Sequence, residues 1–263
     1  LLHAFLPHKF IDHTHSNAVL ALTDQKDGEA LCKRVYGKRL GLVPYIMPGF
    51  DLSKKALEVY EADPSVEGLI LLKHGIFTFG DTAKEAYGRM IAMVSLAERR
   101  LKRGRRKVFA PAKLPKKTAR VHDVAPVLKG LVARSGQRLV LEFRGGPKVL
   151  NFVGGREVGR YSQQGTPTPD HVIRTKAKPL ITPAPEAGGL DAFRRGTERA
   201  LNRYVKNYRA YFKRNNRRRG RKTAIDPLPR VILVPGLGLF GLGESAWDAG
   251  IAADIAETTA QVI

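Results

Sequence analysis

Residues 68–87, "GLILLKHGIFTFGDTAKEAY", contain the pattern that decides the fold. The apolar run at its start predicts a buried strand that ends at Lys73-His74-Gly75, and residues 76–81 predict a loop. The segment from Thr82 to residue 101 predicts an amphipathic helix. Upstream, residues 40–50 predict a strand stopped by Pro48 and Gly49, and residues 51–64 predict a helix capped by Asp51. This strand, helix, strand, helix order is typical of α/β proteins.

The same pattern occurs again near the end of the chain. Residues 74–86 align with residues 237–249, and five of these thirteen positions are identical. Both segments follow apolar strands, so we expect an internally repeated strand-loop-helix unit in a second, related α/β region. In this region we predict strands at residues 138–145, 147–155 and 230–235, a basic helix at 194–214 and a final helix.

The repeated segment also contains three glycines in G-x-G-x-x-G spacing, Gly236, Gly238 and Gly241. This spacing between a strand and a helix is the context of a dinucleotide-binding loop. No acidic residue about 20 positions on can be placed after a following strand, as that site requires. We therefore favour the repeat as the reason for the glycines.

The organisation predicted from composition is a domain at residues 1–104, a basic linker at 105–135 and a second region at 136–263. Much of the net charge of +22 lies in two blocks, Arg99–Arg120 and Lys213–Lys222. A basic chain suggests nucleic acid as a partner, but no aromatic-basic motif accompanies either block. We expect a solvated linker and helix end, and nucleic-acid binding is disfavoured.

The single cysteine, Cys32, excludes an internal disulfide and a thiolate zinc cluster, and we expect a cytoplasmic protein. The apolar runs are of strand length, so we expect no membrane-spanning segment. Both termini have the pattern of an element's interior, which predicts a fragment of a longer protein.

Three histidines are candidate metal ligands. In a strand, His13 and His15 point to the same face, and His74 lies at the end of a buried strand. Three neutral imidazoles with one position left open are typical of a catalytic zinc site. The residues alone leave a surface or core role for the pair open. Asp12 is the neighbouring carboxylate but points the other way, and His171, Arg174 and Lys176 are either an anion site or solvated loop charges.

The runs "LLHAFLPHKFIDHTHSNAVLALTD" (1–24), "VPYIMPGFDLSKKALEVYEADPSVEGLILLKHGIFTFGDTAKEAYGRM" (43–90) and "GTPTPDHVIRTK" (165–176) resemble the class II aldolase/adducin family. The similarity is greatest to its bifunctional rhamnulose-1-phosphate aldolase/short-chain dehydrogenase members and covers about four fifths of the chain.

The resemblance implies a layered α/β fold and a zinc ion held by His13, His15 and His74. It also implies cleavage of a ketose 1-phosphate in rhamnose metabolism to dihydroxyacetone phosphate and an aldehyde, by a homo-oligomer. The family's site also uses an upstream glutamate as acid/base or as a metal ligand. This glutamate and the phosphate-binding loops would lie before Leu1, and a dehydrogenase domain after Ile263. No catalytic residue is therefore assigned within the chain, and no cofactor other than zinc is expected. The alternative is a non-catalytic, adducin-like interaction module or an inactive fragment.

Overall fold

A computed structural model describes residues 2–104, 109–134, 136–219 and 222–263. The described chain divides into two compact units. The first unit comprises residues within 1–106, 167–170 and 262–263, and the second comprises residues within 107–166 and 171–261.

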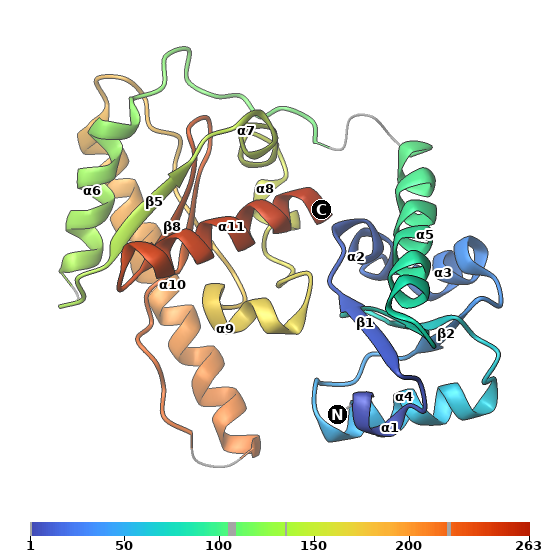
Figure 1. Cartoon of the computed structure of the whole chain (residues 1–263). Coiled ribbons are helices and arrows are strands. Elements are labelled where there is room, and N and C mark those ends of the chain that lie inside the picture. Colours follow the sequence, from blue (N-terminus) through green and yellow to red (C-terminus); the bar gives the residue numbers. More distant parts are fainter. Residues whose placement is uncertain (1, 105–108, 135, 220–221) are drawn as a thin grey trace. The chain divides into compact units, whose positions relative to one another are not determined.

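The first unit is built on a four-stranded sheet in the order β1-β4-β3-β2 (Figure 1). Strand β4 is antiparallel to both β1 and β3, and β2 is parallel to β3. The elements, in chain order, are α1 (Leu2–Phe5), β1 (Phe10–Thr14), α2 (Asn17–Thr23), α3 (Gly28–Tyr36), β2 (Leu40–Val43), α4 (Phe50–Ala62), β3 (Gly68–Leu71), β4 (Gly75–Gly80) and α5 (Ala83–Lys102).

The first sheet is covered on both faces, and the alternation of its strands sets which side chains enter which core. Leu69, Phe77 and Phe79 pack with residues of α1 and α4 on one face. Ile70 and Ile76 pack with residues of α2, α3 and α5 on the other. The all-apolar burial of β3 follows from this three-layer arrangement, which matches the predicted α/β class.

The second unit has a sheet of the same design, with the order β5-β8-β7-β6 and the same sequence of antiparallel and parallel pairings. Helix α11 lies along this sheet in Figure 1. The elements are α6 (Val121–Ala133), β5 (Val140–Arg144), α7 (Pro147–Val153), α8 (Val158–Tyr161), α9 (Val172–Thr175), β6 (Leu180–Ile181), α10 (Leu190–Arg219), β7 (Val231–Val234), β8 (Gly238–Gly243) and α11 (Ala246–Val262). A short 3₁₀ turn, η1 (Pro169–His171), precedes α9.

The predicted internal repeat is confirmed at the level of strand register. Thr14 pairs with Ile76 in the first sheet, and Arg144 pairs with Leu239 in the second. Since residues 74–86 correspond to 237–249, these are equivalent pairs. Both units therefore contain the same four-stranded framework.

Two predicted elements are wrong, and one predicted helix cap is also wrong, because α4 begins at Phe50 with Gly49 rather than Asp51 at its N-cap. Residues 76–81, expected to be a loop, lie almost entirely in β4, and the equivalent glycine-rich stretch forms β8. Each of these strands pairs on both sides, and one partner of each lies far away in the sequence. Residues 147–155, expected to be a strand, begin with helix α7, which has Pro147 in its first turn, where the missing N–H costs nothing.

The glycines of the G-x-G-x-x-G spacing have local structural roles. Gly236 has φ +81° in the turn before β8, and Gly238 has φ +149° at the start of the strand. Gly241 lies in β8 under α11, where an added Cβ would come within 2.3 Å of the Ala249 carbonyl oxygen. These glycines therefore belong to a turn and a covered strand, not to a loop that leads into a helix.

The segment predicted as a basic linker, 105–135, includes helix α6, whose Val124, Leu128 and Leu131 are buried in the second unit's core. Residues 105–108 and 135 of that segment, and residues 220–221 of the second basic block, lie outside the described residues. Within the described chain, no helix combines the length and apolarity needed to cross a membrane.

Candidate metal centre

Three histidines of the first unit converge where β1 ends beside the turn between β3 and β4. His13 is in β1, His15 follows the end of that strand, and His74 immediately precedes β4. The antiparallel pairing of Thr14 with Ile76 brings these segments together. One ligand atom of each ring lies within 4.8 Å of the others.

Gly75 makes this convergence possible, because its missing side chain leaves room for two of the rings. A Cβ at this position would lie 2.6 Å from the Thr14 carbonyl oxygen, 2.9 Å from His15 Cδ2 and 3.0 Å from His13 Cε1. The glycine thus allows the backbone of β4 to approach β1 without displacing the imidazoles.

Two contacts orient the imidazole ring of His13. Its Nδ1–H donates to the carbonyl oxygen of Ile76 at 3.0 Å, and its ring stacks on Phe77 with centroids 4.0 Å apart. Because Nδ1 faces a carbonyl oxygen, it carries the proton, and in the neutral ring Nε2 is a free acceptor. A backbone hydrogen bond of this kind commonly fixes the tautomer of a metal-ligating histidine.

The free acceptor of His13 points at a second imidazole nitrogen. His13 Nε2 lies 3.0 Å from His15 Nε2. Burial, followed by the nearby His15, lowers the pKa of His13, and burial, followed by His13, lowers the pKa of His74. Both effects favour the neutral imidazoles that bind metals.

His74 also carries an unsatisfied polar atom. It is 8% exposed, and its Nδ1 is buried with no hydrogen-bond partner among the described residues. A buried polar group without a partner costs free energy, which is typical of a functional position. A donor set of three imidazoles could hold a transition-metal ion, and zinc is one of the ions it suits.

A carboxylate that the sequence reasoning missed lies beside this cluster. Asp170 Oδ2 is 3.8 Å from His15 Nε2 and 4.0 Å from His74 Nε2. Asp170 belongs to the short segment 167–170 that is part of the first unit. The sequence offers one signal that could have identified this carboxylate: Asp170 is the only charged residue in 161–170, and it directly follows Pro169.

The other sequence candidates lie elsewhere. Asp12 occupies the opposite face of β1 from His13, because successive strand residues alternate. Arg174 forms an ion pair with Asp248 at 3.1 Å. Lys176 donates to the backbone carbonyls of Asp226 and Leu228. The charges of Arg174 and Lys176 are thus engaged by protein groups, which disfavours the anion site considered for them.

The second unit has no imidazole at the equivalent positions, which are Phe143, Gly145 and Leu237. Phe143 pairs with Phe240 just as His13 pairs with Phe77. Its ring fills the space next to the glycine, since a Cβ on Gly145 would lie 2.7 Å from Phe143 Cζ. The second unit therefore has the ring of Phe143 where the first unit has the imidazole of His13.

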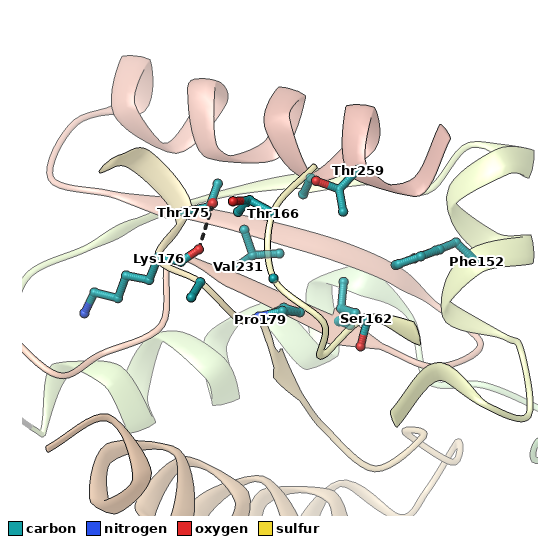
Figure 2. Close-up of a pocket in the computed structure, with 12 residues that line it drawn as sticks. Phe152, Ser162, Thr166, Thr175, Lys176, Pro179, Val231 and Thr259 are labelled. Atoms are coloured by element: carbon teal, nitrogen blue, oxygen red, sulfur yellow. Dashed lines mark hydrogen bonds between the residues drawn. The ribbon is translucent and has the colours of Figure 1, made fainter. Parts of the chain in front are cut away.

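A small cavity inside the second unit is lined by Ser162, Thr166, Thr175 and Lys176, among others (Figure 2). The Thr175 hydroxyl donates to the Lys176 carbonyl oxygen at 3.1 Å, as the dashed line in Figure 2 marks. The cavity volume is about 30 Å³, which suits water rather than an organic ligand. The histidine cluster is the stronger candidate for a functional site.

Two family models match the chain. Residues 1–101 match the class II aldolase and adducin N-terminal domain, and residues 119–263 match the second domain of class II aldolase. The chain is 32% identical over 253 residues to a curated relative from Bacillus subtilis (strain 168), "Uncharacterized oxidoreductase YuxG". The match covers 93% of this chain but 36% of the relative, so the chain spans about a third of that protein's length.

Two solved structures are also similar over part of the chain. The N-terminal class II aldolase domain of a conserved protein from Thermoplasma acidophilum is 42% identical, over 38% of this chain and 46% of that chain, with a TM-score of 0.35. An aldolase II superfamily protein from Pseudomonas syringae is 22% identical, over 35% of this chain and 38% of that chain, with a TM-score of 0.29.

Proposed function

Because the chain belongs to the class II aldolase and adducin family, we propose that it contributes a metal-dependent aldolase centre built from His13, His15 and His74. The observation that carries this proposal is the approach of His13 Nε2 to His15 Nε2 at 3.0 Å, with His74 in the same cluster. We further propose zinc as the ion, since a donor set of three imidazoles suits it.

The residues of the chain have distinct roles in this proposal. His13 keeps Nε2 available because Nδ1–H is bound to the Ile76 carbonyl oxygen. Gly75 leaves the rings free to converge, and Phe77 fixes the plane of the His13 ring. When bound, the ion would supply Lewis-acid stabilisation of the negative charge that develops on substrate oxygen as a carbon–carbon bond breaks.

The substrate is proposed from the sequence resemblance: a ketose 1-phosphate similar to rhamnulose 1-phosphate, cleaved to dihydroxyacetone phosphate and an aldehyde. A homo-oligomer is proposed on the same ground, and a cytoplasmic setting is proposed from the single cysteine, Cys32. The relative's name describes an oxidoreductase, but the glycines that would form a dinucleotide loop here belong to β8 and the turn before it. This observation disfavours a dinucleotide-binding loop at these glycines.

The first experiment is elemental analysis of the purified protein after dialysis against zinc-free buffer. We expect about one zinc per chain, lost in the His13→Ala/His15→Ala double variant and retained in His122→Ala, whose histidine lies on α6 of the other unit. Cleavage of the ketose phosphate, measured as release of dihydroxyacetone phosphate, should follow the zinc content. A wild-type protein without metal would contradict the proposal and support the adducin-like interaction module instead.

A further inference from the structure

We propose that Asp170 is the anionic fourth donor of the three-histidine centre, an inference that rests on the proposed function. The carboxylate oxygen Oδ2 of Asp170 faces two of the three imidazoles, at 3.8 Å from His15 Nε2 and 4.0 Å from His74 Nε2. These distances are longer than hydrogen bonds and lie at the outer limit of an ion pair.

The spacing of these atoms matches that of ligands around one ion. With metal–nitrogen and metal–oxygen bonds of about 2.0–2.2 Å, tetrahedral ligands lie roughly 3.3–3.6 Å from each other. The distances are 3.0 Å between His13 and His15, 3.8 Å from His15 to Asp170 and 4.0 Å from His74 to Asp170. The ligand atoms of the three histidines lie within 4.8 Å of one another. The two Asp170 distances exceed the expected value by less than about 1 Å, so a contraction of the cluster would bring the carboxylate into the same coordination sphere.

Charge supports the same assignment. Three neutral imidazoles offer a divalent cation no negative charge, and a nearby carboxylate lowers the cost of holding the ion. Asp170 is the acidic group whose charge acts on both His13 and His74. The family model that matches the histidines ends at residue 101, so this carboxylate is encoded in the part of the sequence that matches the second domain.

The backbone around Asp170 is suited to hold the side chain in place. Pro167 and Pro169 fix the φ angles of two of the three preceding residues, and Asp170 lies in the short 3₁₀ turn η1. Such a segment loses little conformational entropy when its carboxylate meets an ion. The side chain itself is 51% exposed, so its replacement should leave the fold of the first unit intact.

The test compares zinc affinity, measured by competition with a chromogenic chelator, in the wild type, Asp170→Asn and Asp12→Asn. Asp12→Asn is the matched control, because Asp12 adjoins His13 in sequence but lies on the other face of β1. We expect Asp170→Asn to weaken zinc binding about 10–100-fold and Asp12→Asn to change it less than about 3-fold. Circular dichroism would verify that both variants fold.

A second readout reports the coordination sphere itself. With cobalt(II) in place of zinc, loss of the Asp170 carboxylate should change the visible absorption bands, whereas Asp12→Asn should not. Equal affinity and unchanged bands in Asp170→Asn would overturn this inference while leaving the three-histidine centre in place. A wild-type chain that binds neither ion would overturn the proposed function together with the inference.

Discussion

His13 and His15 point their Nε2 atoms at each other across 3.0 Å, while the Nδ1–H of His13 is held by the carbonyl oxygen of Ile76. The hydrogen bond to Ile76 determines which nitrogen faces His15, because a neutral ring whose Nδ1 donates has its lone pair at Nε2. The turn that carries His74 and the strand that carries His13 are therefore coupled through the start of β4.

The first prediction concerns Gly75. In Gly75→Ala the new methyl group would lie 2.6 Å from the Thr14 carbonyl oxygen and 3.0 Å or less from two imidazoles, so β1 and β4 must separate. We expect a loss of about 1–3 kcal/mol in the free energy of unfolding, measured by urea denaturation, and weaker zinc binding. Gly88→Ala, with nothing within 4 Å, is the control and should leave zinc binding unchanged. Wild-type affinity in Gly75→Ala would refute the steric argument.

The histidine cluster could be predicted only with the family resemblance, because the residues alone left a surface or core role for His13 and His15 open. The period of two in a strand puts His13 and His15 on one face, and a histidine at the end of a buried strand lies at the sheet's edge. Asp170 could not be placed, because its approach to the rings depends on tertiary structure across a gap of 96 residues from His74.

Dependence on tertiary structure also explains the two wrongly predicted elements of the fold. The alternation in "GIFTFG" is compatible with a strand, but its glycines suggest a loop until β1 and β3 are known to pair on either side. In "PKVLNFVGG", the apolar residues suit a strand as well as a short helix, and Pro147 was the signal for the helix start. The internal repeat was more reliable because it compares the chain with itself.

The second prediction concerns pH. Burial raises the pKa of Asp24 to about 7, and its Oδ1 has no hydrogen-bond partner among the described residues. The folded protein thus binds a proton that the unfolded chain releases near pH 4, so this carboxyl lowers stability as pH rises from about 4 to 7. We expect Asp24→Asn to stabilise the protein by about 1–3 kcal/mol at pH 8 and little at pH 4 in urea denaturation. Asp27→Asn, an exposed carboxylate, is the control, and an equal gain at both pH values would argue against the burial of a charge at Asp24.

The third prediction concerns the ionic cluster of the second unit. Asp226 accepts from Arg230 and lies 3.7 Å from the ammonium of Lys176, and all three side chains are less than a fifth exposed. Asp226→Ala leaves two cations without their counter-ion, and we expect a loss of about 3 kcal/mol in the free energy of unfolding. Asp191→Ala, at an 83% exposed position, should cost less than about 0.5 kcal/mol. Similar losses in the two variants would mean that the cluster does not stabilise the second unit.

The last prediction uses the second copy of the repeat as a guide to the first. Leu237 stands where the first copy has His74, so His74→Leu places a residue that this framework already accommodates. Because the buried Nδ1 of His74 has no partner among the described residues, its removal should stabilise the metal-free protein by about 1–3 kcal/mol. Zinc at 100 times its dissociation constant should stabilise the wild type by about 2.7 kcal/mol, and this gain should be lost in His74→Leu.

The measurement is urea denaturation of both proteins with and without zinc. His122→Leu controls for the loss of a histidine away from the cluster. A metal-free His74→Leu protein less stable than the wild type would mean that the imidazole contributes packing or a hydrogen bond to the fold itself. If zinc stabilised wild type and variant equally, His74 would not be a ligand. We expect His74→Leu to be more stable than the wild type without metal and not to respond to zinc. This result would show that the His74 imidazole lowers the stability of the metal-free protein and is needed for zinc binding.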